Sequence, residues 1–363
     1  MTLSKAMTAT KIAKLEAHDL LVELVETPSV SGNEGACAEL LTSFFEEHGR
    51  EAWIDDVGNV RAPGNEILLT SHIDTVPGKI PVEVDDGVLW GRGSVDAKGP
   101  LAAMAAAAVE TGASFVGVVG EETDSRGARR LVEDYSEPKF VVNGEPSGWD
   151  AVTLGYRGFL SGTYSVSVES IHTSRPEPNA IQHAVSWLSA VESAFEPNAD
   201  STGTAGSMDE SGSVFESVTA KPVSFDGGLA ADGLATEAEI EVQFRIPPGT
   251  TADEICEIAE TELDSGEVSW NDSIPSTMAS PRTELARAFR VAIRGEDGDP
   301  SLLRKTGTSD ANIYAEAWDC PVVTYGPGDS SLDHTPEEHL ELAEFDQSVA
   351  VLSTVCESLE GKL

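Results

Sequence analysis

Metal-binding side chains follow a short apolar segment early in this 363-residue chain. His72 and Asp74 come after the run Ile-Leu-Leu, which has the composition of a buried parallel strand. On an extended backbone the two side chains point to the same side, so the carboxylate can orient the imidazole for a metal ion. Asp96 lies in a glycine-rich loop, where it could bridge two ions or simply cap the helix predicted behind it. Each feature alone is common in proteins that bind no metal, so a metal site requires further ligands.

Acidic residues also end two later apolar segments. Glu121 and Glu122 follow the stretch SFVGVVG, and Glu145 lies just after FVVN. Adjacent residues at a strand end point in different directions, so one glutamate can bind a metal ion while the other faces a metal-bound water. The alternative is a solvated acidic loop. His334 lies in a loop after the apolar strand PVVTY and could complete the set, although a lone histidine is more often structural.

These residues require a sheet whose strand ends converge. Ligands gather at the carboxyl ends of parallel strands, and the alternation of helical and strand patterns predicts an α/β layer fold. An alanine-rich helix should follow Asp96. The other elements that we expect are helices at 13–25, 35–48 and 280–294 and strands at 53–60, 66–70, 114–120 and 140–143.

A second module interrupts this pattern near residue 154, where apolar and polar residues begin to alternate. Such alternation is typical of a sheet with one face open to water or to a partner. The order that follows is β-α-β-β-α-β, which predicts a ferredoxin-like α+β module. Its later elements are a helix at 180–195, a loop at 198–212, strands at 214–223 and 237–246, a helix at 252–263 and a strand near 268. We therefore predict a catalytic domain at 1–154 and 280–363, with an inserted domain at 155–279.

The charge of the chain excludes several partners. There are 63 Asp and Glu residues against 23 Lys and Arg residues, a formal charge of −40. Such a surface repels nucleic acid and anionic membranes. The acidic residues are spread along the whole chain, which fits a protein adapted to high salt. The four cysteines form no C-x-x-C pair, and no apolar segment approaches the ~20 residues of a membrane span. We expect a cytoplasmic protein.

The whole constellation resembles the M20 family of dinuclear metallohydrolases, over nearly the full chain. The resemblance implies a three-layer, zinc-peptidase-like α/β catalytic domain with an inserted ferredoxin-like lid domain that forms a homodimer. It also implies two divalent ions per subunit, zinc or else cobalt or manganese, and a non-proline cis peptide after the bridging Asp96. The implied roles are one ion held by His72, Asp96 and Glu145, a second held by Asp96, Glu122 and His334, Glu121 as general base, and Asp74 as the residue that orients His72.

Further matches concern the substrate. His172, in IHTSRP, resembles a family histidine that reaches the partner subunit's active site, although Thr173 replaces a serine of that motif. Arg245, in RIPPG, matches an arginine that grips a substrate carboxylate. Thr308 and Asp310 belong to KTGTSDAN, a loop suited to an anionic or zwitterionic ligand, in which Asp310 could meet a side-chain ammonium.

Within the family, the segments KTGTSDAN and YGPGDSSLDHTPEEH look most like hydrolases that release lysine or ornithine from the γ-glutamyl terminus of an acidic amino-group carrier protein, in lysine or arginine biosynthesis. A cluster of Arg126, Arg129 and Arg130 could dock such a carrier or could pair with acids of its own helix. An N-acetylornithine or N-acetyl-lysine deacetylase and an M20 dipeptidase share the metal chemistry and are the alternatives. A non-catalytic relative would be expected to lack a ligand or the base.

Overall fold

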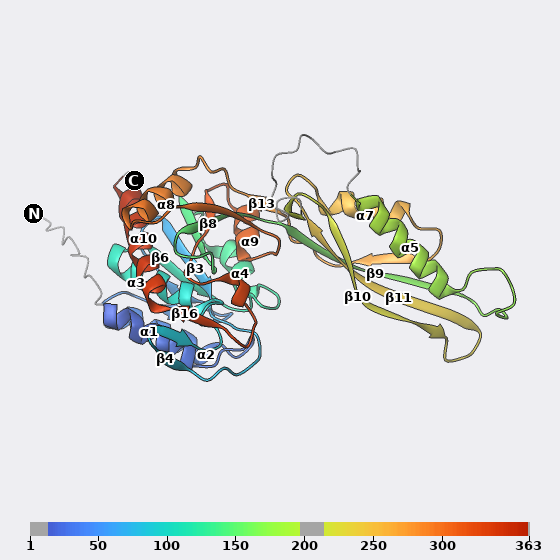
Figure 1. Cartoon of the computed structure of the whole chain (residues 1–363), viewed down its shortest axis with the longest axis horizontal. Helices are drawn as coiled ribbons and strands as arrows, with labels where there is room; N and C mark the ends of the chain where they lie inside the picture. Colours follow the sequence, from blue (N-terminus) through green and yellow to red (C-terminus); the bar gives the residue numbers. More distant parts are fainter. Residues whose placement is uncertain (1–13, 197–213, 362–363) are drawn as a thin grey trace, which may run out of the picture. The chain divides into compact units, whose positions relative to one another are not determined.

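The computed structural model describes residues 14–196 and 214–361, and the predicted loop at 198–212 lies outside them. The described residues form two compact units (Figure 1). Unit 1 is drawn from Met1–Leu154, Ala279–Leu303 and Ser309–Leu363, and unit 2 from Gly155–Met278 and Arg304–Thr308. The sequence had placed 304–308 in the returning part of the catalytic domain, whereas the structure groups this short segment with unit 2.

Unit 1 contains a central mixed sheet with strand order β1-β2-β6-β3-β7-β15-β8. Its three inner strands β6, β3 and β7 are parallel, so their carboxyl ends meet at one edge. These inner strands are apolar and fully buried because helices cover both faces of the sheet. The bounds are β1 (Trp53–Ile54), β2 (Val60–Ala62), β3 (Ile67–His72), β6 (Ser114–Val118), β7 (Phe140–Gly144), β8 (Ala151–Tyr156) and β15 (Val322–Thr324); β14 (Ser301–Lys305) also pairs with β8.

Helices form the outer layers of unit 1. Helix α3 (Lys98–Thr111) packs against β3 and β6, and its alanines allow α1 (Lys14–Glu26) and α10 (Leu342–Glu360) to approach it closely. Helix α9 (Asp310–Ala317) packs against β7 and β15 and contacts α4 (Arg126–Asp134). The remaining helices are α2 (Gly35–Glu47), against β1 and β2, and α8 (Glu284–Gly295), against α10.

A small three-stranded sheet in unit 1 brings two distant loops together. Its order is β16-β5-β4, with β4 at Glu83–Asp85, β5 at Val88–Trp90 and β16 at His339–Glu341. The loop carrying Asp96 begins immediately after β5, and the loop carrying His334 ends immediately before β16. Pairing of β5 with β16 therefore holds the two loops side by side.

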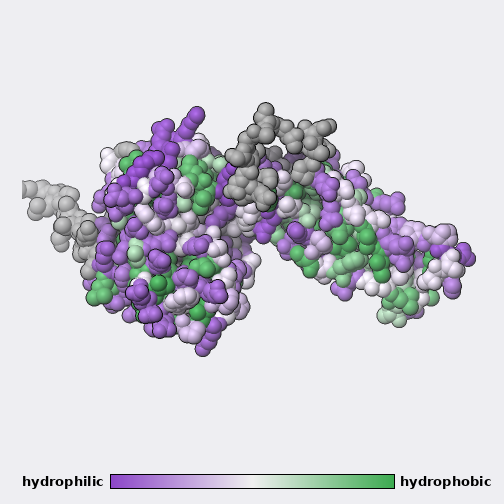
Figure 2. Space-filling view, viewed as in Figure 1, coloured by the Kyte–Doolittle hydropathy of each residue, from purple (hydrophilic) through white to green (hydrophobic). Residues whose placement is uncertain are grey.

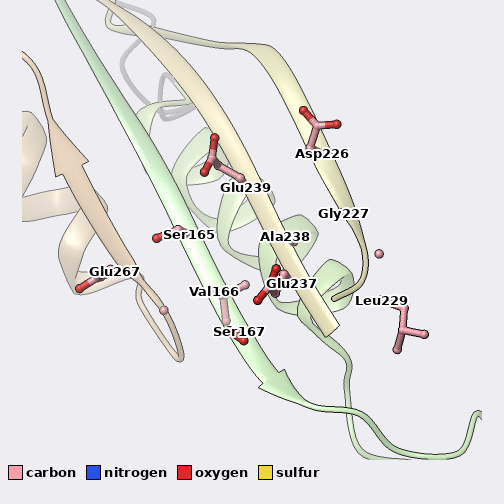
Figure 3. A pocket seen from close by; sticks show the side chains of 12 residues that line it. Ser165, Val166, Ser167, Asp226, Gly227, Leu229, Glu237, Ala238, Glu239 and Glu267 are labelled. Atoms are coloured by element: carbon pink, nitrogen blue, oxygen red, sulfur yellow. The ribbon is translucent and has the colours of Figure 1, made fainter. Parts of the chain in front are cut away.

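Unit 2 has the predicted β-α-β-β-α-β order and a hydrophobic core of its own. Its antiparallel sheet has the order β10-β11-β9-β12, with helices α5 and α7 on one face. The other face is open and carries carboxylates of Asp226, Glu237, Glu239 and Glu267 around a hollow of about 780 Å³ (Figure 3). The bounds are β9 (Gly158–Glu169), α5 (Ala180–Phe195), β10 (Thr219–Leu229), β11 (Ala235–Ile246), α7 (Ala252–Thr261) and β12 (Glu267–Trp270). The short strand β13 (Thr277–Met278) does not join this sheet and pairs with the end of β8.

Two strands predicted from the sequence differ from the structure. The segment expected as one strand at 53–60 is two short strands, because the Asp55 carboxylate accepts the backbone N–H groups of Val57, Gly58 and Asn59 in a turn. The strand expected at 214–223 begins later, at Thr219, and continues to Leu229. Among the described residues, no helix is both long enough and apolar enough to cross a membrane.

Candidate metal centre

The metal-binding residues are positioned by the register of the parallel strands. His72 is the last residue of β3 and lies opposite Val118 of β6. On the other side of β3, Ser71 lies opposite Gly144, so Glu145 follows directly beyond the end of β7. The side chains of three different segments therefore converge at one edge of the sheet, as strand-end chemistry in an α/β fold requires.

The first cluster consists of His72, Asp96 and Glu145, all of which are buried. The Nε2 atom of His72 lies 3.1 Å from Asp96 Oδ1 and 3.9 Å from Glu145 Oε2. The ligand atoms of the cluster lie within 4.8 Å of one another, close enough to share one divalent ion. Two carboxylates and an imidazole, without thiolate, form a donor set that suits zinc, cobalt or manganese.

The second cluster shares Asp96 with the first and adds Glu122 and His334. The Nε2 atom of His334 lies 3.1 Å from Asp96 Oδ2 and 3.1 Å from Glu122 Oε2. Asp96 thus presents one oxygen to each histidine, which is the arrangement of a carboxylate that bridges two ions. The Asp96–Ala97 peptide bond is cis, as the family resemblance implies.

Asp74 connects His72 with the acidic turn that follows β6. The His72 Nδ1 atom lies 2.9 Å from the Asp74 carbonyl oxygen and 3.6 Å from its carboxylate, so the backbone is the closer partner. The carboxylate accepts hydrogen bonds from the backbone N–H groups of Glu121 and Glu122, at 3.1 and 3.2 Å. The Ser31 hydroxyl donates a further bond of 2.7 Å. Asp74 therefore fixes both the histidine and the acid pair.

Contacts within the two clusters shift the pKa values of their members. Burial opposes the charged form of His72, but hydrogen bonds to Asp74 and Asp96 raise its pKa well above the ordinary value. A hydrogen bond to Asp96 raises the pKa of His334 to about 9. Burial likewise opposes ionisation of Asp96, but hydrogen bonds from His334 and His72 hold the pKa of its carboxyl below the usual range. The contacts of both imidazoles therefore favour the charged form in the metal-free protein.

Glu121 lies next to the two clusters and belongs to neither of them. Burial and the nearby Glu145 carboxylate raise the pKa of Glu121 well above its ordinary value. A carboxyl with a raised pKa is a stronger base than an ordinary glutamate and can also return the proton, which is what a general base in amide hydrolysis must do.

Two of the predicted substrate-binding residues meet within unit 2. An Nη1–H of Arg245, on β11, donates to the Thr308 hydroxyl at 3.2 Å, and the guanidinium lies 4.9 Å from the centre of the Phe159 ring. Burial lowers the pKa of Arg245. His172 is exposed in the segment between β9 and α5, where its Nδ1 lies 2.8 Å from the Ser174 hydroxyl.

Asp310 occupies a different environment from that expected of a contact with substrate. It is the first residue of α9, and only 1% of its surface is exposed. Burial raises the pKa of its carboxyl to about 7. In this conformation a substrate ammonium would not reach Asp310 from solvent.

Sequence reasoning missed three side chains that support the centre. Ser31 bonds Asp74, as described above, and the Lys98 ammonium donates to the carbonyl oxygens of Leu24 and Thr27 beneath the Asp96 loop. Glu338 is completely buried and accepts the backbone N–H of Asp96. Its only signal in the sequence is an acid pair shortly after His334, and nothing distinguishes Glu338 from Glu337 there.

Comparison with known proteins agrees with this geometry. The model of "Peptidase family M20/M25/M40" matches residues 68–358. A "[LysW]-lysine hydrolase" of Deinococcus radiodurans is 40% identical over 365 residues, covering 95% of this chain and 97% of the relative. A "Putative [LysW]-lysine/[LysW]-ornithine hydrolase" of Thermococcus kodakarensis is 38% identical over 356 residues, covering 96% and 94%.

A solved structure supports the fold alone. The aminopeptidase PepT from Bacillus cereus superposes with a TM-score of 0.78 at 20% sequence identity, covering 97% of this chain and 100% of that one. Together, these matches confirm the fold class and the family resemblance predicted from the sequence. This chain belongs to peptidase family M20/M25/M40.

Proposed function

We propose that this chain is a metal-dependent amide hydrolase that releases lysine or ornithine from the terminal glutamate of an amino-group carrier protein. The observation that carries the reaction class is the pair of three-residue clusters that share Asp96, with the Glu121 carboxyl beside them. The substrate assignment is supported by two relatives, at 38% and 40% identity, whose names describe hydrolysis of LysW-linked amino acids.

The residues of the centre divide the work of amide hydrolysis. A pair of divalent ions, when bound, lowers the pKa of a water and polarises the amide carbonyl. Glu121 removes a proton from the attacking water and delivers it to the departing α-amino group, so that the C–N bond breaks without releasing an amide anion. Asp74 keeps Glu121 in place through its bond to the Glu121 backbone N–H.

Zinc is the ion that we propose for both positions, with cobalt or manganese as substitutes. Imidazole and carboxylate ligands are compatible with all three ions, and no cysteine belongs to either cluster within the described chain. Inductively coupled plasma mass spectrometry of protein purified without chelators identifies the bound ions. The same measurement on protein loaded with zinc gives their number, and fewer than two ions per chain would contradict a dinuclear centre.

Arg245 and Thr308 are the residues that we propose for binding a substrate carboxylate. Arg245 is partly buried, and its guanidinium can donate two parallel hydrogen bonds to a carboxylate beside the Thr308 hydroxyl that it contacts. Asp310 stays a predicted partner of the side-chain ammonium and requires a conformation that exposes it. An unchanged KM for a lysyl substrate in Asp310→Ala would remove that role.

We further propose that unit 2 forms a homodimer through its edge strand β10. Among residues 14–196 and 214–361, no strand pairs with the outer side of β10, and Val223, Phe225 and Leu229 on it are 50%, 47% and 64% exposed. Figure 2 shows hydrophobic residues exposed on unit 2 among hydrophilic ones. The open sheet face in Figure 3 is acidic and would repel its own copy, which favours the edge as the contact.

Measuring the oligomeric state also tests the proposal that His172 acts in the active site of the partner subunit. Light scattering after gel filtration should give twice the chain mass for the wild type and the single mass for Phe225→Asp. A monomeric wild type with full activity would exclude a contribution of His172 in trans.

The substrate is tested by hydrolysis with the zinc-loaded protein in high KCl. Carrier-linked lysine, carrier-linked ornithine and N-acetylornithine are compared at equal concentration by measuring the free amino acid. A higher kcat/KM for either carrier-linked substrate supports the proposal and selects the amino acid. A preference for N-acetylornithine would leave the metal chemistry intact and replace the substrate by that of a deacetylase.

A further inference from the structure

A buried glutamate joins the two loops that supply the second metal cluster. Glu338 has no exposed surface, although a buried carboxylate is costly unless its charge and its hydrogen-bonding capacity are satisfied. Its Oε1 atom accepts the backbone N–H groups of Val95 and Asp96, at 3.0 and 3.1 Å. Its Oε2 atom lies 2.6 Å from Nη1 of Arg92, which supplies the opposite charge. Both oxygens therefore bond to one short loop.

Glu338 and the loop that it binds each lie on a segment that carries a metal ligand. Asp96 is the ligand shared by both clusters, and its backbone nitrogen is one of the two bound by Glu338. His334 lies four residues before Glu338 on the same loop. The backbone adds a third link, since the Glu338 carbonyl oxygen accepts the Gly91 N–H at 3.4 Å. Displacing Glu338 would therefore let Asp96 and His334 move apart.

We propose that Glu338 is a positioning residue for the second metal ion, acting through its two hydrogen bonds to the backbone of the Asp96 loop. The ion held by Asp96, Glu122 and His334 depends on the spacing of two loops that are far apart in the sequence. The ion held by His72, Asp96 and Glu145 has two ligands at strand ends, which the central sheet fixes independently of Glu338. Loss of Glu338 should therefore weaken the second ion more than the first.

Substitutions at position 338 separate the ion pair with Arg92 from the hydrogen bonds to the backbone. Glutamine at position 338 keeps a carbonyl oxygen that can accept the Val95 and Asp96 N–H groups but loses the charge that pairs with Arg92. Alanine removes both interactions. Asp55 offers a matched control, because its Oδ1 accepts three backbone N–H groups and its Oδ2 pairs with Arg61 at 2.8 Å, on the turn between β1 and β2, which carries no metal ligand.

The experiment is a calorimetric titration of the metal-free protein with zinc, which measures each binding step without reference to catalysis. His334→Ala identifies the step that belongs to the second ion, since that step should disappear. In Glu338→Ala we expect its affinity to fall by about 10- to 100-fold, the usual effect of removing a residue that supports metal ligands, with a smaller change in the first step. Glu338→Gln should recover most of the affinity, and Asp55→Ala should bind both ions as the wild type does.

Thermal melts of the metal-free variants separate positioning from general destabilisation. Similar melting temperatures for Glu338→Ala and Asp55→Ala, with the metal defect only in the former, support the proposal. Wild-type affinities in Glu338→Ala, an equal loss in Asp55→Ala, or a Glu338→Gln variant as weak as the alanine variant would each overturn it. Because only metal binding is measured, a failure here is distinguishable from a wrong substrate.

Discussion

Metal binding by this protein should release protons and should strengthen as the pH rises from 7 to 9. A zinc ion binds an unprotonated imidazole nitrogen. In the metal-free protein, however, a hydrogen bond to Asp96 raises the pKa of His334 to about 9, so this imidazole is protonated at neutral pH. Binding of the second ion at pH 7 must displace that proton, and the cost of doing so disappears as the pH approaches the pKa.

The size of the effect follows from the distance between the pH and the pKa. Two units below its pKa, His334 is unprotonated in only about 1% of the molecules, and at the pKa it is unprotonated in about half, so the affinity can rise at most about 50-fold between pH 7 and pH 9. The His334 side chain is 52% exposed, and solvent screening weakens its interactions with Asp96 and Glu122. We therefore expect an increase of about 10- to 50-fold.

The assay is calorimetric titration with zinc at several pH values, in buffers with different enthalpies of ionisation. The buffer dependence gives the number of protons released. His334→Ala should release fewer protons and lose the second step, whereas His339→Gln should behave as the wild type. His339 is a suitable control because it lies nearby, stacks on Trp90 at 4.2 Å and belongs to neither cluster. A second-step affinity that does not change between pH 7 and pH 9 would refute the reasoning.

Four further outcomes can be measured. Glu121→Gln should lower kcat by about 10²- to 10⁴-fold while both ions still bind. The control Glu83→Gln, on the exposed strand β4, should change neither kcat nor metal binding. Loss of metal in the Glu121 variant would contradict a role as base. Arg245→Lys should raise KM more than it lowers kcat, because an ammonium cannot replace a bidentate guanidinium; a purely kcat effect would argue against carboxylate binding. Burial raises the pKa of Asp310 to about 7, so its contribution to stability is complete below its ordinary pKa and is lost as the pH rises through 7. Urea unfolding of the metal-free protein should therefore find Asp310→Asn more stable than the wild type at pH 8.5, by roughly a few kcal/mol, and the difference should shrink progressively as the pH falls from 7 toward 4; a difference independent of pH would contradict this. The melting temperature should rise from low to molar KCl, where the screening length falls to about 3 Å, and a constant melting temperature would count against salt adaptation.

The metal ligands were predictable because each follows a strongly marked element. His72 and Glu145 end fully buried apolar strands, and parallel strands necessarily bring their carboxyl ends together. The structure accordingly places these two side chains 3.9 Å apart, although they are far apart in the sequence. The order of elements in unit 2 was predictable for a similar reason, since its alternating strands and amphipathic helices have distinct periods.

What the sequence could not reveal depends on contacts between distant segments. The arginines of α4 illustrate this, because spacing predicted pairs within the helix. Arg130 does pair with Asp134 at 3.5 Å, but its closer partner is Asp56 at 3.1 Å, and Arg126 binds Glu34 at 2.7 Å. These pairs neutralise much of the patch that a carrier protein would need for docking.

Local turn chemistry explains another difference. The run Asp55 to Asn59 contains residues that favour turns, yet the flanking apolar residues suggested one continuous strand. Three hydrogen bonds from the backbone to the Asp55 carboxylate divide it. The side chain thus competes successfully with the strand ladder, which periodicity alone does not register.

The anchoring of the acid pair by Asp74 has a consequence for genetics. Because one carboxylate holds the backbone of both Glu121 and Glu122, a substitution at Asp74 displaces the base and a metal ligand together. Effects of mutations at these three positions should therefore not add, and a damaged Asp74 should mask further losses at its neighbours. Variation at Asp74 is then constrained by proton transfer and by metal binding at the same time, whereas a substitution of Glu121 alone changes proton transfer.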